Sequence, residues 1–235
     1  MATTSVAAAY VNNDGGLTVT SGSFNVVTDD LIVVAGHSDE DIGTPIWVIS
    51  DNQAPDLAYT EIARRDDTDG LDGAVIAWYH RVVSNITGLT ITLTVSGVNV
   101  DSPAIKVYKV TGYDTADILG AQTEGNWTSI GQQTGNITAE TAGIGIVVAT
   151  DWNQTGTSTS ADTTETGFDT GGDISGMSGY RTLVAAASEN ADMTSPGTPS
   201  GNYLWFEIRE APGGATTWGP LLGLMNNRLV QEGPR

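Results

Sequence analysis

The sequence predicts an all-β protein built as an antiparallel β-sandwich, with jelly-roll or immunoglobulin-like connectivity, little helix and an extended C-terminal arm. Three observations lead to this prediction. Apolar residues are grouped in short blocks, and the most regular block, LTITLTV at residues 89–95, alternates with a period of two. Clusters of Gly, Asp, Asn, Ser and Pro separate the blocks, as turns do. No long window keeps an apolar helical stripe with a cap.

The strands are predicted from the composition of the blocks. In residues 89–95, Leu, Ile and Val occupy one face and Thr the other, which is typical of a half-buried antiparallel strand. Further blocks rich in β-branched and aromatic residues predict strands at 24–27, 31–35, 46–50, 74–83, 104–110, 144–150, 182–188 and 203–208. Residues 114–123 are the nearest approach to a helix, of a turn or two.

The chain is expected to form one sandwich domain over residues 1–212, followed by an arm over residues 213–235. No exact repeat is visible, and no linker separates two halves. Residues 153–181 are rich in Thr, Gly, Ser and Asp and poor in large apolar side chains, so they predict long loops around at most a weak strand.

The arm is unusually apolar for a chain terminus, and it follows a Gly-Gly hinge. One interpretation is a last strand that returns over its own sandwich; the other is an arm that docks on a neighbouring subunit. Buried Trp and Leu side chains would then anchor it. The candidate interface residues are Trp218, Leu221, Leu222, Leu224, Met225, Arg228 and Leu229.

Composition excludes several functional classes. The chain has 28 acidic and 9 basic residues, a net charge of −19, which disfavours nucleic acid because phosphate binding needs clustered Lys and Arg. With no cysteine, there is no disulfide, thiolate metal site or cysteine nucleophile. No apolar run reaches the length of a membrane span. We expect no nucleic-acid partner, no membrane partner and no cofactor.

Motifs for catalysis are missing, and we predict no catalytic residues. His80 is expected to be a packed or rim histidine in a strand, and His37 to lie in an exposed acidic turn. The sequence contains no nucleophile elbow, P-loop or H-E-x-x-H motif. A carbohydrate-active enzyme would need two carboxylates, for which Glu61 and Glu207 are the loose candidates. Solvent-facing strand positions are the favoured interpretation of both.

Two binding hypotheses carry named residues. Asp66, Asp67, Asp69 and Asp72 lie in RDDTDGLDG, and oxygen ligands on a Gly-bent loop suit calcium. Their spacing departs from the EF-hand rule, so a solvated acidic hairpin loop is favoured over a calcium site.

For glycan contact, the candidates are Trp127 and Trp152, because both lie near predicted turns, whereas Trp47, Trp78 and Trp205 lie in strand blocks. An exposed indole ring could stack on a sugar.

Residues 20–115 resemble a β-sandwich module of tailed-bacteriophage virion proteins and some bacterial surface proteins. The resemblance rests on the turn at 48–52, the aromatic pair Trp78-Tyr79, the T-x-T-x-x-G strand at 92–97 and the V-Y-x-x-x-G strand at 107–112. Residues 53–56 read Gln-Ala-Pro-Asp where the module usually has Gly-Asn-x-Trp. The resemblance implies no catalytic residues.

The resemblance implies a non-enzymatic virion structural protein, with a capsid decoration (cement) protein on the shell exterior favoured over a tail location. Its partners would be the major capsid protein or other virion subunits, and it would form a homo-oligomer, with trimers common in such proteins. A tail or receptor-binding subunit that adheres to glycans is the alternative. A secreted carbohydrate-active enzyme is the rival from another class.

Overall fold

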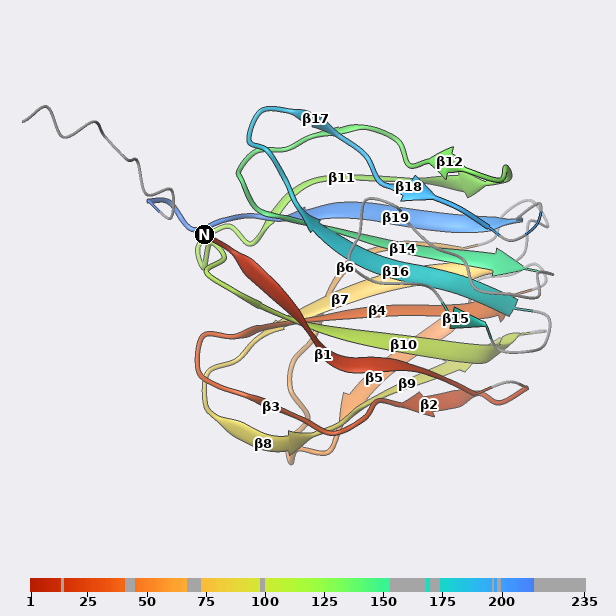
Figure 1. Ribbon diagram of the computed structural model, residues 1–235. Coiled ribbons are helices and arrows are strands. Elements are labelled where there is room, and N and C mark those ends of the chain that lie inside the picture. The colour runs from red at the N-terminus through yellow and green to blue at the C-terminus, as the bar shows by residue number, and fades with distance from the viewer. Residues whose placement is uncertain are drawn as a thin grey trace, which may run out of the picture.

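All regular structure in the described residues is β-strand, and every strand pair is antiparallel (Figure 1). The computed structural model describes residues 1–13, 15–40, 45–66, 73–97, 100–152, 168–169, 174–195, 197 and 200–213. The prediction of an all-β, sandwich-like protein is therefore confirmed. Within these ranges, no helix is long and apolar enough to cross a bilayer.

The strands form four stacked layers (Figure 1). The two inner layers are five-stranded sheets, and the two outer layers consist of smaller sheets. One inner sheet has the order β1 (Thr3–Asn12), β10 (Val100–Thr111), β4 (Leu31–Glu40), β7 (Ala74–Arg81) and β6 (Thr60–Arg65). The other has the order β11 (Leu119–Trp127), β19 (Gly201–Ile208), β14 (Ile144–Trp152), β16 (Ile174–Thr182) and β15 (Phe168–Asp169).

The outer layers cover the far faces of these sheets. The first consists of β2 (Thr18–Thr20), β9 (Ile91–Ser96) and β5 (Ile46–Asp51) in one sheet, beside the pair β3 (Phe24–Val26) and β8 (Ile86–Leu89). The second consists of the pair β12 (Gln132–Gln133) and β18 (Asp192–Met193) and the pair β13 (Ile137–Thr138) and β17 (Ser188–Glu189).

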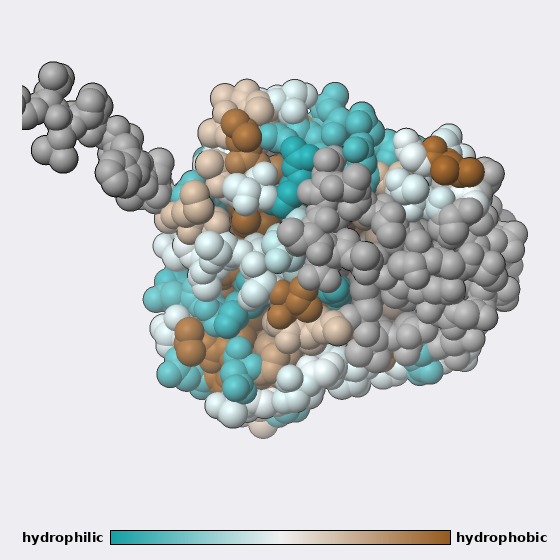
Figure 2. Space-filling model, viewed as in Figure 1, coloured by the Kyte–Doolittle hydropathy of each residue, from teal (hydrophilic) through white to brown (hydrophobic). Residues whose placement is uncertain are grey.

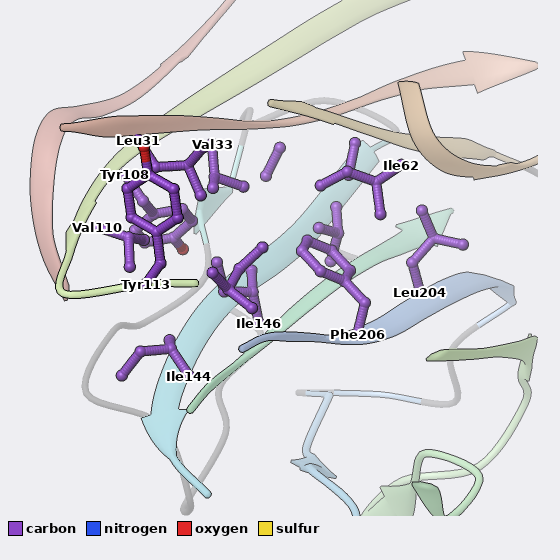
Figure 3. Close-up of a cluster of buried hydrophobic side chains, with 14 of the residues drawn as sticks. Leu31, Val33, Ile62, Tyr108, Val110, Tyr113, Ile144, Ile146, Leu204 and Phe206 are labelled. Atoms are coloured by element: carbon purple, nitrogen blue, oxygen red, sulfur yellow. The ribbon is translucent and has the colours of Figure 1, made fainter. Parts of the chain in front are cut away.

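Three apolar cores fill the three spaces between layers. Leu31, Tyr108 and Phe206 belong to the middle core, where the two inner sheets pack face to face (Figure 3). The outer cores lie under the outer layers, around Leu93 on one side and Trp205 on the other. Because both faces of each inner sheet are covered, its strands are apolar in consecutive positions, as in LIVVA and IGIVVA, rather than alternating.

The strand pairing in the first half of the chain is nested. β1 pairs with β10, β2 with β9, β3 with β8 and β4 with β7. This is the connectivity of a jelly roll, in which one long antiparallel ribbon of strands is wrapped into two facing sheets. Of the two connectivities expected from the sequence, the structure selects the jelly roll.

The second half of the chain repeats this nesting strand by strand. β11 pairs with β19, β12 with β18, β13 with β17 and β14 with β16, and the two inner sheets have corresponding strand orders. Among the described residues of the second half, no strand corresponds to β5. The structure therefore shows two similar jelly rolls packed through their inner sheets, a repeat of topology that the amino-acid identities conceal.

Three local predictions were wrong. The segment 114–123 is not helical, since β11 begins at Leu119. The predicted strand at 182–188 is mostly a turn, with Ala186 at φ 59°. The strand lies earlier, as β16, inside the segment predicted as loop. β16 needs few large apolar residues because Tyr108 of the facing sheet fills the space, and its hydroxyl lies 2.7 Å from the Ser178 hydroxyl.

Candidate functional site

Most of the site residues predicted from the sequence lie outside the described residues. Apart from Gly213, this holds for the whole arm 213–235, including Trp218 and the other candidate anchors. It also holds for Asp67, Asp69 and Asp72 of the acidic loop. For Trp152 only the backbone, within β14, is described. These hypotheses stay predictions.

Asp66 is the described member of the acidic loop. Its side chain is 15% exposed, and a carboxylate oxygen lies 3.6 Å from Nε of Arg64. Burial raises the pKa of this carboxyl against the opposite influence of Arg64 and of the Trp47 indole. Among the described residues, no group of three or more His, Asp or Glu side chains could share a metal ion.

The glycan hypothesis is wrong for Trp127. Its indole is fully buried in the core under the second outer layer, and Nε1 donates a hydrogen bond to the carbonyl of Ser129 at 3.1 Å. The register of β11, which pairs Trp127 with Gly201, turns the ring inward. Nearness to a turn therefore did not mean exposure here, and the ring has no face free for a sugar.

Glu207 is fully buried rather than solvent-facing, which corrects the sequence-based interpretation. Both of its oxygens are engaged. Oε1 accepts hydrogen bonds from the backbone N–H and the hydroxyl of Thr141, each at 2.8 Å, and Oε2 accepts one from the N–H of Glu140 at 2.8 Å. Glu61, by contrast, is 47% exposed and lies 3.9 Å from Arg64. Because the Glu207 carboxylate is occupied by holding a turn, this acid pair gives no support to hydrolysis.

His37 also departs from the expectation of an exposed turn. It lies within β4, opposite Ala104 and Val75, and is fully buried. Burial lowers its pKa to about 3. His80 is a rim histidine as predicted, with Nδ1 2.8 Å from the carbonyl of Ala58 and its ring beside Tyr59.

A feature that the sequence reasoning missed is the near absence of charge on the first outer layer. We call the outward side chains of β2, β3, β5, β8 and β9 the neutral face. Apart from Asp51 at the end of β5, these strands come from residues 15–28, 45–50 and 82–97, which contain no Asp, Glu, Lys or Arg, although 16% of the chain is charged. In Figure 2, pale residues of near-neutral hydropathy run along the lower border, where Figure 1 places these strands.

Threonine hydroxyls organise the centre of this face. Thr18 of β2 lies opposite Thr94 of β9, and their hydroxyl oxygens are 3.1 Å apart. In the next row, the hydroxyls of Thr20 and Thr92 are 2.9 Å apart. Hydroxyls that pair with each other across strands leave a flat surface with few unsatisfied polar groups.

Exposed apolar side chains occur in the same three uncharged stretches, with Ile46 and Val48 on β5 itself. Leu17, Val27, Ile46, Val48 and Val83 are all exposed, and all belong to the three uncharged stretches. Single exposed apolar residues are ordinary, whereas contiguous exposed apolar patches are typical of protein-contact sites.

The opposite outer layer is different in character. Gln133 donates a hydrogen bond to Asp192 at 2.6 Å, and Arg181 forms an ion pair with Glu189. Ion pairs also link Arg209 to Asp117 and Glu140 at this half of the molecule. The two outer layers share a topology, yet the longer described strands of the first carry a single charged residue, Asp51 at the end of β5, whereas the short strands of the second carry Glu189 and Asp192. This contrast makes the neutral face the candidate functional surface.

The signal was present in the sequence as the three stretches without charge at 15–28, 45–50 and 82–97. It was not recognised because nothing in one dimension shows that these stretches meet in one layer. No protein-family model matches the chain, and no similar protein was found among curated proteins.

Proposed function

We propose that the protein is a non-enzymatic structural subunit of a tailed-bacteriophage virion, a decoration protein that attaches to the outside of the capsid shell. The neutral face is its attachment surface. The observation that carries the proposal is the combination of exposed Ile46 and Val48 with paired threonines on nearly uncharged strands of a chain of net charge −19. The resemblance of residues 20–115 to virion modules supplies the setting.

The charge of the chain restricts where it can contact another protein. Strong negative charge keeps copies soluble and apart, and it repels packaged DNA. A contact surface for protein must lose its water, and uncharged side chains lose water at the lowest cost. The predicted arm at 213–235 would add a second anchor, and the resemblance implies a homo-oligomer on the shell.

The location is tested by immunogold electron microscopy of purified phage particles with antibody against this chain. Gold spread evenly over the head supports the proposal. Gold confined to the tail replaces it with the tail or receptor-binding subunit, and absence of gold from every particle overturns the virion setting.

The surface is tested by adding purified protein to shells that lack it and measuring the bound fraction. Thr94→Lys places a charge in the centre of the neutral face, and we expect attachment to fall at least tenfold. Thr138→Lys is the matched control, because Thr138 is an exposed strand residue of the opposite outer layer. Equal attachment of both variants contradicts the proposed surface.

A further inference from the structure

The strand β5 lies at the open edge of the first outer layer. In the described residues it pairs with β9 alone, in the order β2-β9-β5. An edge strand presents unpaired backbone N–H and C=O groups, and proteins commonly protect such edges with charged side chains. The edge strand β6 of the neighbouring sheet carries Glu61, Arg64 and Arg65. β5 reads IWVISD and has no charge before Asp51.

The hydrogen-bond pattern shows which groups of β5 face the open side. On β9, the N–H of Val95 and the carbonyl of Ile91 bond to the segment of β2, through Leu17 and Ser21. The even-numbered residues of β9 therefore bond to β5, and Asn52 N–H continues this ladder to Thr90 at 3.3 Å. Because bonding direction alternates along an antiparallel strand, the backbone groups of Trp47 and Ile49 point away from β9.

From this edge we propose that β5 pairs antiparallel with β5 of a second copy, which makes the protein a two-fold symmetric dimer. With Val48 facing the second copy's Val48 at the symmetry axis, Trp47 lies opposite the second copy's Ile49. The outward-directed backbone groups then meet as hydrogen-bonded pairs, and the outward side chains of both strands fall on one face.

Charge favours a second copy as the occupant of this edge. Two chains of net charge −19 repel each other over most of their surface, and the neutral face is where they approach without opposing like charges. Ile46 and Val48, which are 63% and 52% exposed, would be partly covered by the contact. The pairing is isologous, so it uses up the edge and stops at two copies.

The Asp51 carboxylate does not oppose this arrangement. Its oxygens accept hydrogen bonds from the N–H groups of Gln53 and Leu57, at 2.7 and 3.0 Å, so it is held in its own turn. The dimer would join two neutral faces into one continuous sheet surface, twice the size of each. The inference itself does not depend on the assembly to which the protein attaches.

The test is sedimentation velocity of the full chain over a range of concentrations. We expect wild type to dimerise, and Val48→Lys and Val48→Glu each to weaken the dimer about tenfold or more, because like charges then face each other at the axis. An equimolar mixture of the two variants restores the dimer. Val184→Lys, at an exposed valine of the second half, leaves it unchanged.

Circular dichroism of each variant checks that the fold is retained, as an exposed position allows. Wild type that stays monomeric, or that forms a trimer, overturns the proposal. Dimers of Val48→Lys as strong as wild type overturn it as well, and failure of the mixture to reassociate overturns the register that places Val48 at the axis. Shell attachment is measured separately, so loss of one proposal does not decide the other.

Discussion

Replacing Glu207 with Gln should destabilise the protein although the two side chains have nearly the same size. The carboxylate accepts three hydrogen bonds at 2.8 Å, two from Thr141 and one from Glu140, and a longer one from the N–H of Ala121 at 3.4 Å. An amide offers one oxygen. In its better orientation this oxygen keeps the Thr141 bonds, and the amide nitrogen then faces the Glu140 N–H.

The cost follows from these contacts. Two backbone donors, the N–H of Glu140 and the more distant N–H of Ala121, lose their acceptor, at about 1–3 kcal/mol in all, and the remaining bonds lose the contribution of the charged oxygen. We expect Glu207→Gln to lower the free energy of unfolding by about 3 kcal/mol, which corresponds to roughly 6–12 °C in Tm for a chain of this length. Urea unfolding followed by tryptophan fluorescence measures the first quantity, and calorimetry the second.

Glu61→Gln is the matched control. It makes the same chemical change at a side chain that is 47% exposed and whose nearest cation is 3.9 Å away, so the effect should stay within about 0.5 kcal/mol. If Glu207→Gln unfolds at the same denaturant concentration as wild type, the view of Glu207 as a buried acceptor that holds the backbone at Glu140 and Thr141 is refuted.

Other predictions concern His37, Gly145 and Arg65. The folded-state pKa of His37 is lowered to about 3, so its contribution to stability should be fully present above about pH 6.5. The free energy of unfolding should then decline by up to roughly 5 kcal/mol as the pH falls towards 3. His37→Leu should flatten this part of a stability-against-pH curve, and an unchanged curve would contradict the role of His37. Gly145→Ala would place a Cβ 2.1 Å from the Trp205 ring. Thermal unfolding should therefore show a loss of stability of about 2 kcal/mol. An unchanged Tm would mean that the ring moves freely. The Arg65 guanidinium donates hydrogen bonds to Asn202, at 2.9 Å, and to Asn126, and so joins the two inner sheets. Arg65→Met should lower the free energy of unfolding by roughly 2 kcal/mol, which is more than the same change at the more exposed Arg64. Equal losses of the two variants in urea titrations would contradict this bridge.

The sequence pattern alone was enough to predict the strands whose apolar residues are continuous or alternate. The blocks at 31–35, 144–150 and 203–208 became β4, β14 and β19, because burial on one or both faces leaves a direct mark on residue type. β16 left no such mark. Its position between β14 and β15 holds it in the sheet while Gly and Ser leave room for large rings of the facing layer.

Only part of the candidate surface could be predicted from the sequence. The threonines of 90–94 were predicted to face water, and they do so in part, but their partners Thr18 and Thr20 come from a strand more than 70 residues away in the sequence. Ile46 reaches the same face from a third segment. Likewise, Trp127 and Glu207 are residue types that often occur in functional sites. Only the packing of β11 and β19 shows that both side chains are buried and stabilise the fold.

The sequence by itself determined the class of secondary structure, because a side-chain period of two and frequent turn residues are local properties. It also determined the acidic character and the absence of cysteine chemistry. Only the tertiary structure decided the nested pairing, the topological repeat of the two halves and the assembly of three uncharged stretches into one face. Strand order and register depend on contacts between residues far apart in the chain, and many different side chains satisfy the same pattern of burial.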